Sequence, residues 1–255
     1  MTEKQATRDA YGKALAALGQ ENKQIVVLDA DLSKSTKTAD FQKVCPERFF
    51  NAGIAEQNML GVAAGLAAAG KRPVVSSFAV FATGRAFEQI RNSIAYPKLP
   101  VVIAATHAGV TVGEDGGSHQ AIEDIAIMRA LPNMTVLVPA DGPQTKAALK
   151  AALDYDGPVY LRLGRLAVPA VYEEGESFTI GKGKILQEGK DVAIISCGLM
   201  TAVALEAAEL LAAEGIAATV CDMASMKPID RQLVYSLAAG CGCVVTAEEH
   251  NITGG

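Results

Sequence analysis

The sequence predicts an α/β protein, in which a doubly wound parallel sheet with helices on both faces is followed by a second α/β domain that looks incomplete. Two features of the 255 residues predict this architecture. Short β-branched runs alternate with alanine-rich helical stretches, which is typical of βαβ units on a parallel sheet. The expected strands are also continuously apolar, as strands covered by helices on both faces must be.

The first domain is expected over residues 1–170, where strands and helices alternate regularly. The expected strands are 25–30, 73–78, 101–106, 135–140 and 158–163, and the expected helices are about 55–69, 83–95, 119–130 and 142–153. The helix at 55–69 has almost no polar side chain after its first turn, so we expect it to be buried on most of its circumference.

The second domain is expected over residues 180–255, because a charged, glycine-containing stretch at 168–184 interrupts the pattern and a new alternation follows. Its expected elements are a strand at 191–198, a helix near 200–214, a strand at 217–223, a helix near 230–239 and a strand at 242–250. The chain then ends in NITGG, where a Gly-Gly pair normally leads into another helix. We therefore expect this domain to be truncated.

Charge and hydropathy exclude several classes of partner. The net charge is −5 and no basic run offsets it, so the attraction that drives binding to nucleic acid or to an anionic membrane is missing. The apolar run Gly61–Gly70 is far shorter than the ~20 residues of a membrane-spanning helix. The first ten residues are charged throughout and do not resemble a signal peptide, so we expect a cytoplasmic protein.

The five cysteines are not expected to bind metal. Their spacing contains no paired metal-ligand pattern, and most lie in expected core strands or beside them, which favours buried thiols. The cysteines are Cys45, Cys197, Cys221, Cys241 and Cys243.

Two loops that follow expected strands are the candidates for chemistry, since ligands of open α/β sheets bind beyond the carboxyl ends of the strands. The loop at 107–120 (HAGVTVGEDGGSHQ) holds four glycines, two acids and two of the chain's three histidines. The segment 78–87 (FAVFATGRAF) holds three aromatic side chains. Neither a P-loop nor a G-x-G-x-x-G motif occurs, and one loop does not obviously supply enough metal ligands. The alternative is a long surface loop whose Ser118 caps the next helix.

Glu56 stands at the start of the apolar helix and has two interpretations. An acid in the first turn of a helix interacts favourably with the helix dipole and needs no further role. Alternatively, the carboxyl group lies in an apolar site, where burial raises its pKa so that it can share or donate a proton.

Several stretches in order resemble the pyrimidine-binding domain of transketolases over about residues 5–170. They include DADLSKST, GIAEQNMLGVAAGLA, FAVFATGRAFEQIR and the long block that begins HAGVTVGEDGGSHQ. The tail from residue 180 resembles the start of the transketolase C-terminal domain. The resemblance implies one chain of a split, thiamine-diphosphate-dependent enzyme that transfers a two-carbon ketol unit between sugar phosphates of the pentose phosphate type.

The resemblance also implies roles for individual residues. A glutamate at the position of Glu56 hydrogen-bonds a ring nitrogen of the cofactor's aminopyrimidine and favours its imino tautomer. Phe78 and Phe81 match residues that pack on this ring, and Asp31 matches a cofactor-binding position. Asp115 and His119 match residues at the sugar hydroxyls, with His119 as a proton-transfer group. The matches to the cradle for the sugar phosphate are Arg8, Ser35, His107 and Arg165, with Arg162 as a near alternative to Arg165.

The chain departs from the family pattern in two ways. It has no GDG motif with a following asparagine, the motif that binds the diphosphate and magnesium, so a partner chain (the N-terminal transketolase section) must supply that half of the site. Gly84 stands where some transketolases have an aromatic residue. We expect a hetero-oligomer built on a dimer of pyrimidine-binding domains. The alternatives are the β subunit of a 2-oxo-acid dehydrogenase first component, a deoxyxylulose-phosphate-synthase-like enzyme, and a non-catalytic interaction subunit.

Overall fold

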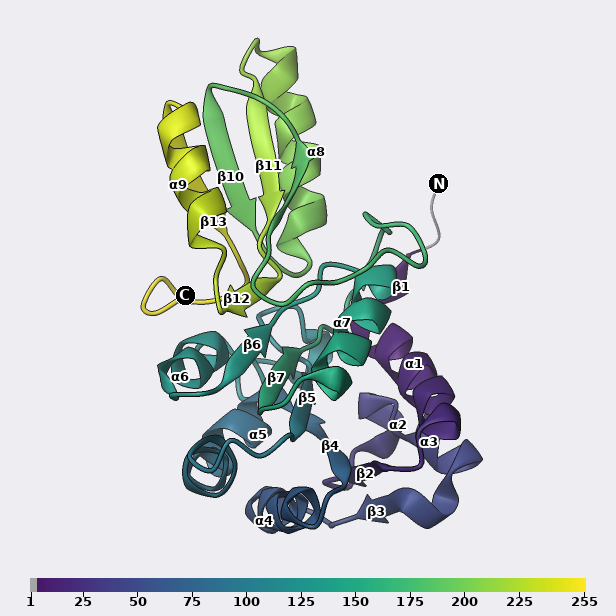
Figure 1. Ribbon diagram of the computed structural model, residues 1–255. Coiled ribbons are helices and arrows are strands. Elements are labelled where there is room, and N and C mark those ends of the chain that lie inside the picture. The colour runs from purple at the N-terminus through teal and green to yellow at the C-terminus, as the bar shows by residue number, and fades with distance from the viewer. Residues whose placement is uncertain (1–3) are drawn as a thin grey trace.

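The computed structural model describes residues 4–255 and contains two α/β units, drawn one above the other in Figure 1. The lower unit, purple to teal, carries the first expected domain, and the upper unit, green to yellow, carries the second. Residues 1–3 of the first expected domain lie outside the described residues.

The larger sheet has seven strands in the order β12-β6-β7-β5-β4-β2-β3. Six of them are parallel, and their bounds are β2 Ile25–Asp29, β3 Phe49–Asn51, β4 Arg72–Phe78, β5 Val102–Thr106, β6 Thr135–Leu137 and β7 Val159–Arg162. Five of these strands confirm the sequence prediction, and β3 was not predicted. The strand order reverses direction along the chain, as a doubly wound sheet requires.

Helices cover both faces of this sheet. One face carries α1 (Thr7–Glu21), α3 (Ala39–Val44) and α7 (Gly142–Asp154), whose apolar side chains share a core with the strands. The other carries α4 (Glu56–Ala68), α5 (Ala79–Arg85), the π-helix η2 (Gln89–Ala95) and α6 (Asp124–Ala130). Short helices α2 (Ser33–Thr36), η1 (Pro46–Arg48) and η3 (Gly113–Asp115) lie in the connections. Asp141 begins α7 by accepting a hydrogen bond from the Gln144 amide at 2.9 Å.

Three helix predictions were wrong in detail. The helix expected at 83–95 is two segments, α5 and η2, and the helical conformation is interrupted at Ala86. The helix expected from 119 begins at Asp124, and Ser118 does not cap it, because its hydroxyl bonds the ring of the adjacent His119. Helix α4 is buried on one face only, since Gly61, Val62 and Gly65 are exposed.

The smaller sheet has the order β13-β10-β11-β9, in which only β9 is antiparallel. Its elements are β9 Lys184–Gln187, β10 Val192–Ser196, α8 Met200–Ala213, β11 Ala218–Asp222, α9 Arg231–Gly240 and β13 Cys243–Ala247. Helices α8 and α9 pack in separate apolar clusters with this sheet. A two-stranded ribbon of β1 (Gln5–Ala6) and β8 (Ala167–Val168) joins the two ends of the first expected domain.

The two units are tied together by strand β12 (Ser225–Lys227). It belongs to the second expected domain, yet it pairs antiparallel with β6 at the edge of the larger sheet. The larger sheet is therefore not purely parallel. The local sequence of residues 225–227 gives no sign that this strand pairs with the sheet of the other unit.

The cysteines divide by location. Cys45, Cys197 and Cys221 are buried, as expected, whereas Cys241 is half-buried and Cys243 is exposed on β13. The buried-thiol interpretation is therefore wrong for Cys243, because β13 is an edge strand. Over residues 4–255, no helix has the length and apolar character needed to cross a bilayer.

Candidate active site

Side chains from four adjacent parallel strands meet at one edge of the larger sheet. Phe78 ends β4, His107 follows β5, Arg165 follows β7 and Asp31 follows β2, and these strands lie side by side in the order β7-β5-β4-β2. Arg8, at the start of α1, joins the group because its backbone N–H donates to the Gly164 carbonyl at 3.4 Å. The predicted residues therefore gather where an open α/β sheet binds its ligands.

Four rings form an aromatic cluster at the centre of this edge. The Phe78 and His107 rings stack with centroids 3.8 Å apart, and Phe81 stacks on Phe78 at 5.8 Å. The His119 ring meets both phenylalanines edge-on, at 6.0 Å from Phe78 and 5.2 Å from Phe81. Phe78 is buried and Phe81 is half-buried, so the cluster offers an aromatic face to a flat ligand.

Glu56 is buried beside this cluster and is ion-paired. It is the first residue of α4, only 4% exposed, and its Oε1 accepts a hydrogen bond from Arg85 Nη1 at 3.1 Å. The Arg85 guanidinium also lies over the Phe81 ring, 4.0 Å from its centroid. Arg85 was missed by the sequence argument, although it follows Phe81 by four residues and so lies on the same face of α5.

Arg8 and His107 are directly connected. Arg8 Nη1 donates to His107 Nε2 at 2.9 Å and to the Ser35 backbone carbonyl at 3.2 Å. Because Nε2 accepts, the ring proton is assigned to Nδ1, which lies 2.9 Å from Thr106 Oγ1. Ser35 contributes its main chain to this contact rather than the expected side chain.

His107 is uncharged at neutral pH. Burial lowers its pKa to about 4, and the neighbouring Arg8 cation contributes to the lowering. Its backbone is in the left-handed region, with φ of 58°, at the point where the chain leaves β5 and enters the long loop. His107 is therefore available as a neutral hydrogen-bonding ring rather than as a cation.

Arg165 is a half-buried member of the group of candidate residues at this edge of the sheet. Its Nη1 donates to the Val112 carbonyl and lies 3.4 Å from Asp115 Oδ2, so it joins strand β7 to the long loop. Burial lowers the pKa of Arg8, and the nearby Arg165 cation acts in the same direction. Two adjacent guanidinium groups favour an anion between or beside them.

Arg162 instead points into the protein interior, where it forms a buried ion pair. Its Nε and Nη2 donate to the two carboxylate oxygens of Asp124 at 2.7 and 3.1 Å, and the Tyr160 hydroxyl donates to Asp124 at 2.6 Å. Although burial opposes it, the Asp124 carboxylate raises the pKa of Arg162. The side chain is 5% exposed, so Arg162 presents little of its guanidinium to a ligand at the surface.

Asp31 is exposed and has left-handed backbone, with φ of 64°. Its Oδ1 accepts from the Asn51 amide at 3.1 Å. The buried Asp29 shapes this turn, since it accepts hydrogen bonds from the Leu32 amide and from Thr36 and Thr38. Asp31 thus lies at the carboxyl end of β2, on a turn that the hydrogen bonds to Asp29 hold in shape.

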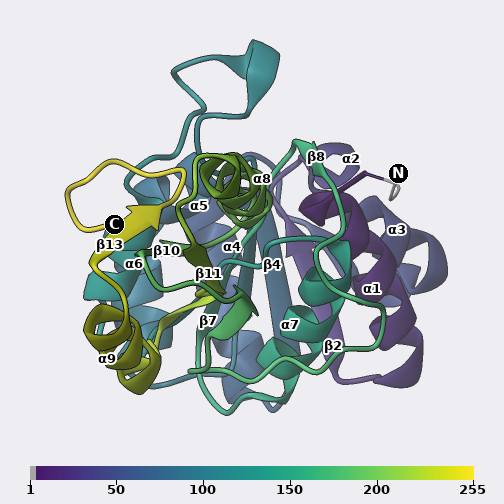
Figure 2. The same cartoon turned by 90° about the horizontal axis from the view of Figure 1, so that it is seen from above.

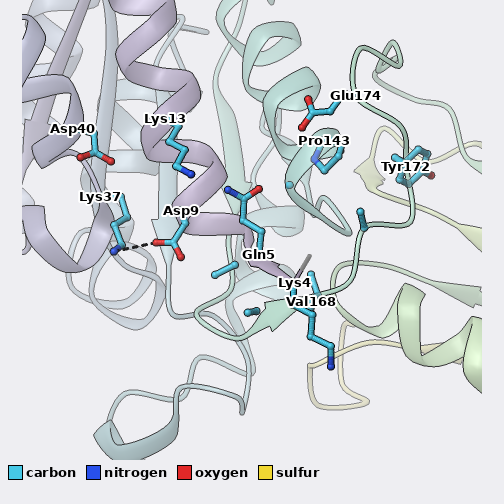
Figure 3. Close-up of a pocket in the computed structure, with 14 residues that line it drawn as sticks. Lys4, Gln5, Asp9, Lys13, Lys37, Asp40, Pro143, Val168, Tyr172 and Glu174 are labelled. Carbon is cyan, nitrogen blue, oxygen red and sulfur yellow. Dashed lines mark ion pairs between the residues drawn. The ribbon is translucent and has the colours of Figure 1, made fainter. Parts of the chain in front are cut away.

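A large cavity of the described structure lies elsewhere. It measures about 610 Å³ and is lined by residues of α1, α7 and the stretch 167–174 (Figure 3). Its charges include a 3.0 Å ion pair between Lys37 and Asp9, drawn as a dashed line. None of the predicted site residues lines it. Among residues 4–255, no group of three His, Cys, Asp or Glu side chains is placed to hold a metal ion.

Comparison with known protein families matches nearly the whole chain. The model for the transketolase pyrimidine-binding domain matches residues 3–170, and that for the transketolase C-terminal domain matches residues 181–255. The chain belongs to the transketolase family. Transketolases depend on thiamine diphosphate, which suits the buried carboxyl group and the aromatic face at the sheet edge.

Individual relatives narrow the assignment within the transketolases. A transketolase C-terminal section from Methanocaldococcus jannaschii is 54% identical over 250 residues, covering 97% of this chain and 78% of that protein. A solved structure described as a split gene transketolase, inactive β4 tetramer, is 66% identical with a TM-score of 0.91, covering 98% of this chain and 82% of that one. This chain therefore corresponds to the C-terminal section of a split transketolase.

The deoxyxylulose-phosphate-synthase alternative has weaker support. Such an enzyme from Geobacter sulfurreducens is 43% identical over 248 residues, but this chain covers only 38% of it. The transketolase prediction is thus confirmed at the level of the family.

Proposed function

We propose that this chain is the pyrimidine-binding subunit of a two-chain transketolase and that it activates thiamine diphosphate through Glu56. The observation that carries the proposal is the buried Glu56 carboxylate beside the Phe78–Phe81 pair. A carboxyl group 4% exposed at the carboxyl edge of a parallel sheet is poorly explained by the helix dipole alone, since that interaction operates equally well at the surface.

The contacts of Arg85 test whether the site fits an aminopyrimidine. The guanidinium is planar, bears N–H donors, stacks over Phe81 and donates to Glu56. These are the two contacts that the family assigns to the aminopyrimidine, and they are satisfied here by a flat group of similar chemistry. Because Arg85 is 50% exposed, it can turn outward and leave this place to the ring. Bound thiamine diphosphate supplies the carbon nucleophile and electron sink of ketol transfer.

Glu56 has a defined task toward that ring. Its carboxyl group holds a proton at the pyrimidine nitrogen, and its burial, with only 4% of the residue exposed, limits the water that can compete for that proton. Phe78 and Phe81 fix the plane of the ring. Asp31, on the turn after β2, contacts the cofactor from the rim.

We assign the sugar phosphate to the Arg8–Arg165 side of the site. Arg8 Nε is buried and has no hydrogen-bond partner within the described residues, so one charge-assisted donor remains for an anion. Once Arg8 turns toward the phosphate, Nε2 of His107 no longer accepts from it, and the ring can donate to the phosphate in the tautomer that carries its proton on Nε2, with the Thr106 hydroxyl donating to Nδ1. Ser35 lies beside Arg8, and its backbone carbonyl accepts a hydrogen bond from the Arg8 guanidinium. Asp115 and His119 face the sugar hydroxyls from the long loop, with His119 as the proton-transfer group.

A second chain is required in this proposal. The sequence lacks the GDG motif that binds the diphosphate and magnesium, so we assign both to an N-terminal transketolase section. The similar protein described as a β4 tetramer is also described as inactive, which is consistent with a site that one chain cannot complete. The cytoplasmic location stays a prediction.

We also propose that two copies of this chain pair through the exposed face of α4. Cβ atoms added at Gly61 and Gly65 would meet nothing within 4 Å, and Val62 between them is 45% exposed. Ile54, just before the helix, is 77% exposed. A small, apolar, open face of this kind suits close packing against the same face of a second copy.

The experiment is to produce this chain with a GDG-bearing partner and to assay ketol transfer with and without thiamine diphosphate. We expect activity only when both chains and the cofactor are present. Robust turnover by this chain alone would overturn the two-chain proposal. A stable complex that binds thiamine diphosphate but never transfers a ketol unit would favour the non-catalytic alternative.

A further inference from the structure

The long loop that carries Asp115 and His119 is held by a carboxylate from the second unit. Glu249 Oε1 accepts hydrogen bonds from the backbone amides of Val110 and Thr111, at 3.1 and 3.0 Å. Gly109 allows this approach, because a Cβ at that position would lie 2.6 Å from the Glu249 carboxyl carbon. Its φ of +82° is also a conformation that glycine adopts without strain.

Glu249 is itself anchored to the buried ion pair of the first unit. Its backbone carbonyl accepts from Arg162 Nη2 at 2.8 Å, and the same guanidinium is bonded to Asp124. A carboxylate on a segment with no other attachment would lose much conformational entropy when it binds the loop. With the backbone already fixed by Arg162, that cost is smaller.

The other end of the loop is held by the neighbouring residue Asn251. Its backbone and side-chain amides donate to the Ile122 carbonyl at 2.9 and 2.6 Å. Between the two attachments the loop closes on itself, since the Gly109 amide donates to the Ala121 carbonyl at 2.8 Å. Residues 249–251 therefore grip both ends of the loop, and we call them the 249–251 clamp.

The tip of the loop has two restraints of its own, the contact of Arg165 with Asp115 and the packing of the His119 ring on Phe78 and Phe81. Residues 113–118 are mostly exposed, and Figure 2 shows the teal loop projecting from the rest of the molecule. Four of the loop's residues are glycines, which raises the entropy that must be lost when the loop takes one conformation. The conformation of its ends therefore acts together with these contacts to set where Asp115 and His119 lie.

We infer that Glu249 is a positioning residue, through which the second unit sets the substrate-binding loop for ketol transfer. This role of the loop rests on the proposed function. Glu56, Phe78 and Phe81 lie outside the loop, so the clamp should affect the sugar and not the binding of thiamine diphosphate. A catalytic group displaced by about 1 Å can lose roughly a hundredfold in rate.

The first test needs no activity. Hydrogen exchange of the Val110 and Thr111 amides is measured in the full chain and in the variants Glu249→Ala, Glu249→Gln and, as an exposed acid on α8, Glu209→Ala. We expect exchange at both amides to be at least about tenfold faster in Glu249→Ala, because two hydrogen bonds to a charged acceptor are lost. Glu249→Gln retains a carbonyl acceptor and should keep most of the protection. Unchanged exchange in Glu249→Ala would overturn the inference.

The second test uses the two-chain complex. In Glu249→Ala we expect KM for the sugar phosphate to rise about tenfold or kcat to fall by a similar factor, with rescue by Glu249→Gln and unchanged affinity for thiamine diphosphate. Normal kinetics despite faster exchange would overturn the positioning role. Equal loss in both variants, together with lost cofactor binding, would also overturn it, because a general folding defect would then explain the result. If the wild-type complex is inactive, the proposed function fails, and hydrogen exchange still decides whether the clamp exists.

Discussion

The Arg85 guanidinium donates a hydrogen bond to the buried Glu56 carboxylate, with 3.1 Å between Nη1 and Oε1. The same guanidinium lies 4.0 Å from the centroid of Phe81. An exposed cation thus occupies two of the groups, Glu56 and Phe81, that the cofactor's aminopyrimidine is proposed to contact. The pair explains how a carboxylate can be buried at the start of α4 before the cofactor arrives.

Removal of Arg85 should favour the cofactor. In Arg85→Ala the ring no longer has to displace a guanidinium, so we expect thiamine diphosphate to bind the two-chain complex a few-fold more tightly. The variant leaves the buried Glu56 carboxylate without its cation, which should cost about 1–3 kcal/mol of the free energy of unfolding, so urea denaturation first checks that the fold is retained. Titration calorimetry measures the affinity, and Arg91→Ala on the same side of the sheet is the control. Weaker binding in Arg85→Ala would show that Arg85 contacts the cofactor instead.

Glu56→Gln should retain the fold and lose most of the activity. The amide cannot act as the acidic partner of a ring nitrogen, and a positioned acid-base group contributes ~10²–10⁴-fold. Ketol transfer by the two-chain complex measures this, with Glu88→Gln, an exposed acid on the following segment, as the matched control. Near-normal turnover in Glu56→Gln would reduce Glu56 to an acid that stabilises the helix start.

Substitutions at the proposed phosphate-binding residues should affect phosphorylated substrates without affecting the ketol-transfer step itself. Arg8→Ala and His107→Ala should each weaken the use of phosphorylated sugars about ten- to a hundredfold, the value of one charge-assisted hydrogen bond. A donor without phosphate, such as hydroxypyruvate, should be used almost normally. Because Arg8 and His107 share a hydrogen bond, the double variant should lose less than the product of the two effects. Equal losses on both donors would contradict the phosphate assignment.

Arg162 and Arg165 should differ sharply in their effect on stability. Arg162→Ala leaves Asp124 buried without its cation, which costs about 3–5 kcal/mol of the free energy of unfolding. Arg165→Ala removes a half-exposed contact and should cost no more than about 1 kcal/mol. Urea denaturation of the chain measures both. Similar stability of the two variants would be incompatible with the buried Arg162–Asp124 pair.

Asp222 should give the protein a pH-dependent stability. Burial raises its pKa to about 6, although Tyr172, Gln144 and Thr201 donate hydrogen bonds to it. The folded state therefore binds more protons than the unfolded state between about pH 4 and 6, and stability from this group falls as the pH rises through that window. Urea denaturation of the wild type and of Asp222→Asn at several pH values checks this. A difference between them that does not change from pH 4 to 7 would refute the raised pKa.

The sequence by itself was enough to predict the α/β class, the five central strands and the edge of the sheet at which the candidate residues gather. Apolar runs such as 101–106 are local signals, and the topology of a doubly wound sheet places the ends of its strands together without further information. The family resemblance then named most of the candidate residues. Glu56, Phe78 and His107 all lie in segments whose local pattern is distinctive.

Only the tertiary structure decided which of the candidate side chains are available to bind a ligand and which are held by partners inside the protein. Arg162 and Arg165 are three residues apart and chemically identical. Asp124, which lies 38 residues from Arg162 in the chain, binds Arg162 and not Arg165. Glu249 contacts amides 139 and 138 residues away, and β12 joins a strand of the other unit. Periodicity and composition report the burial of a residue's own neighbourhood. They carry no information about a partner that only folding brings close. Asp124 is such a partner, and its hydrogen bonds hold Arg162 in the interior while Arg165 stays at the surface.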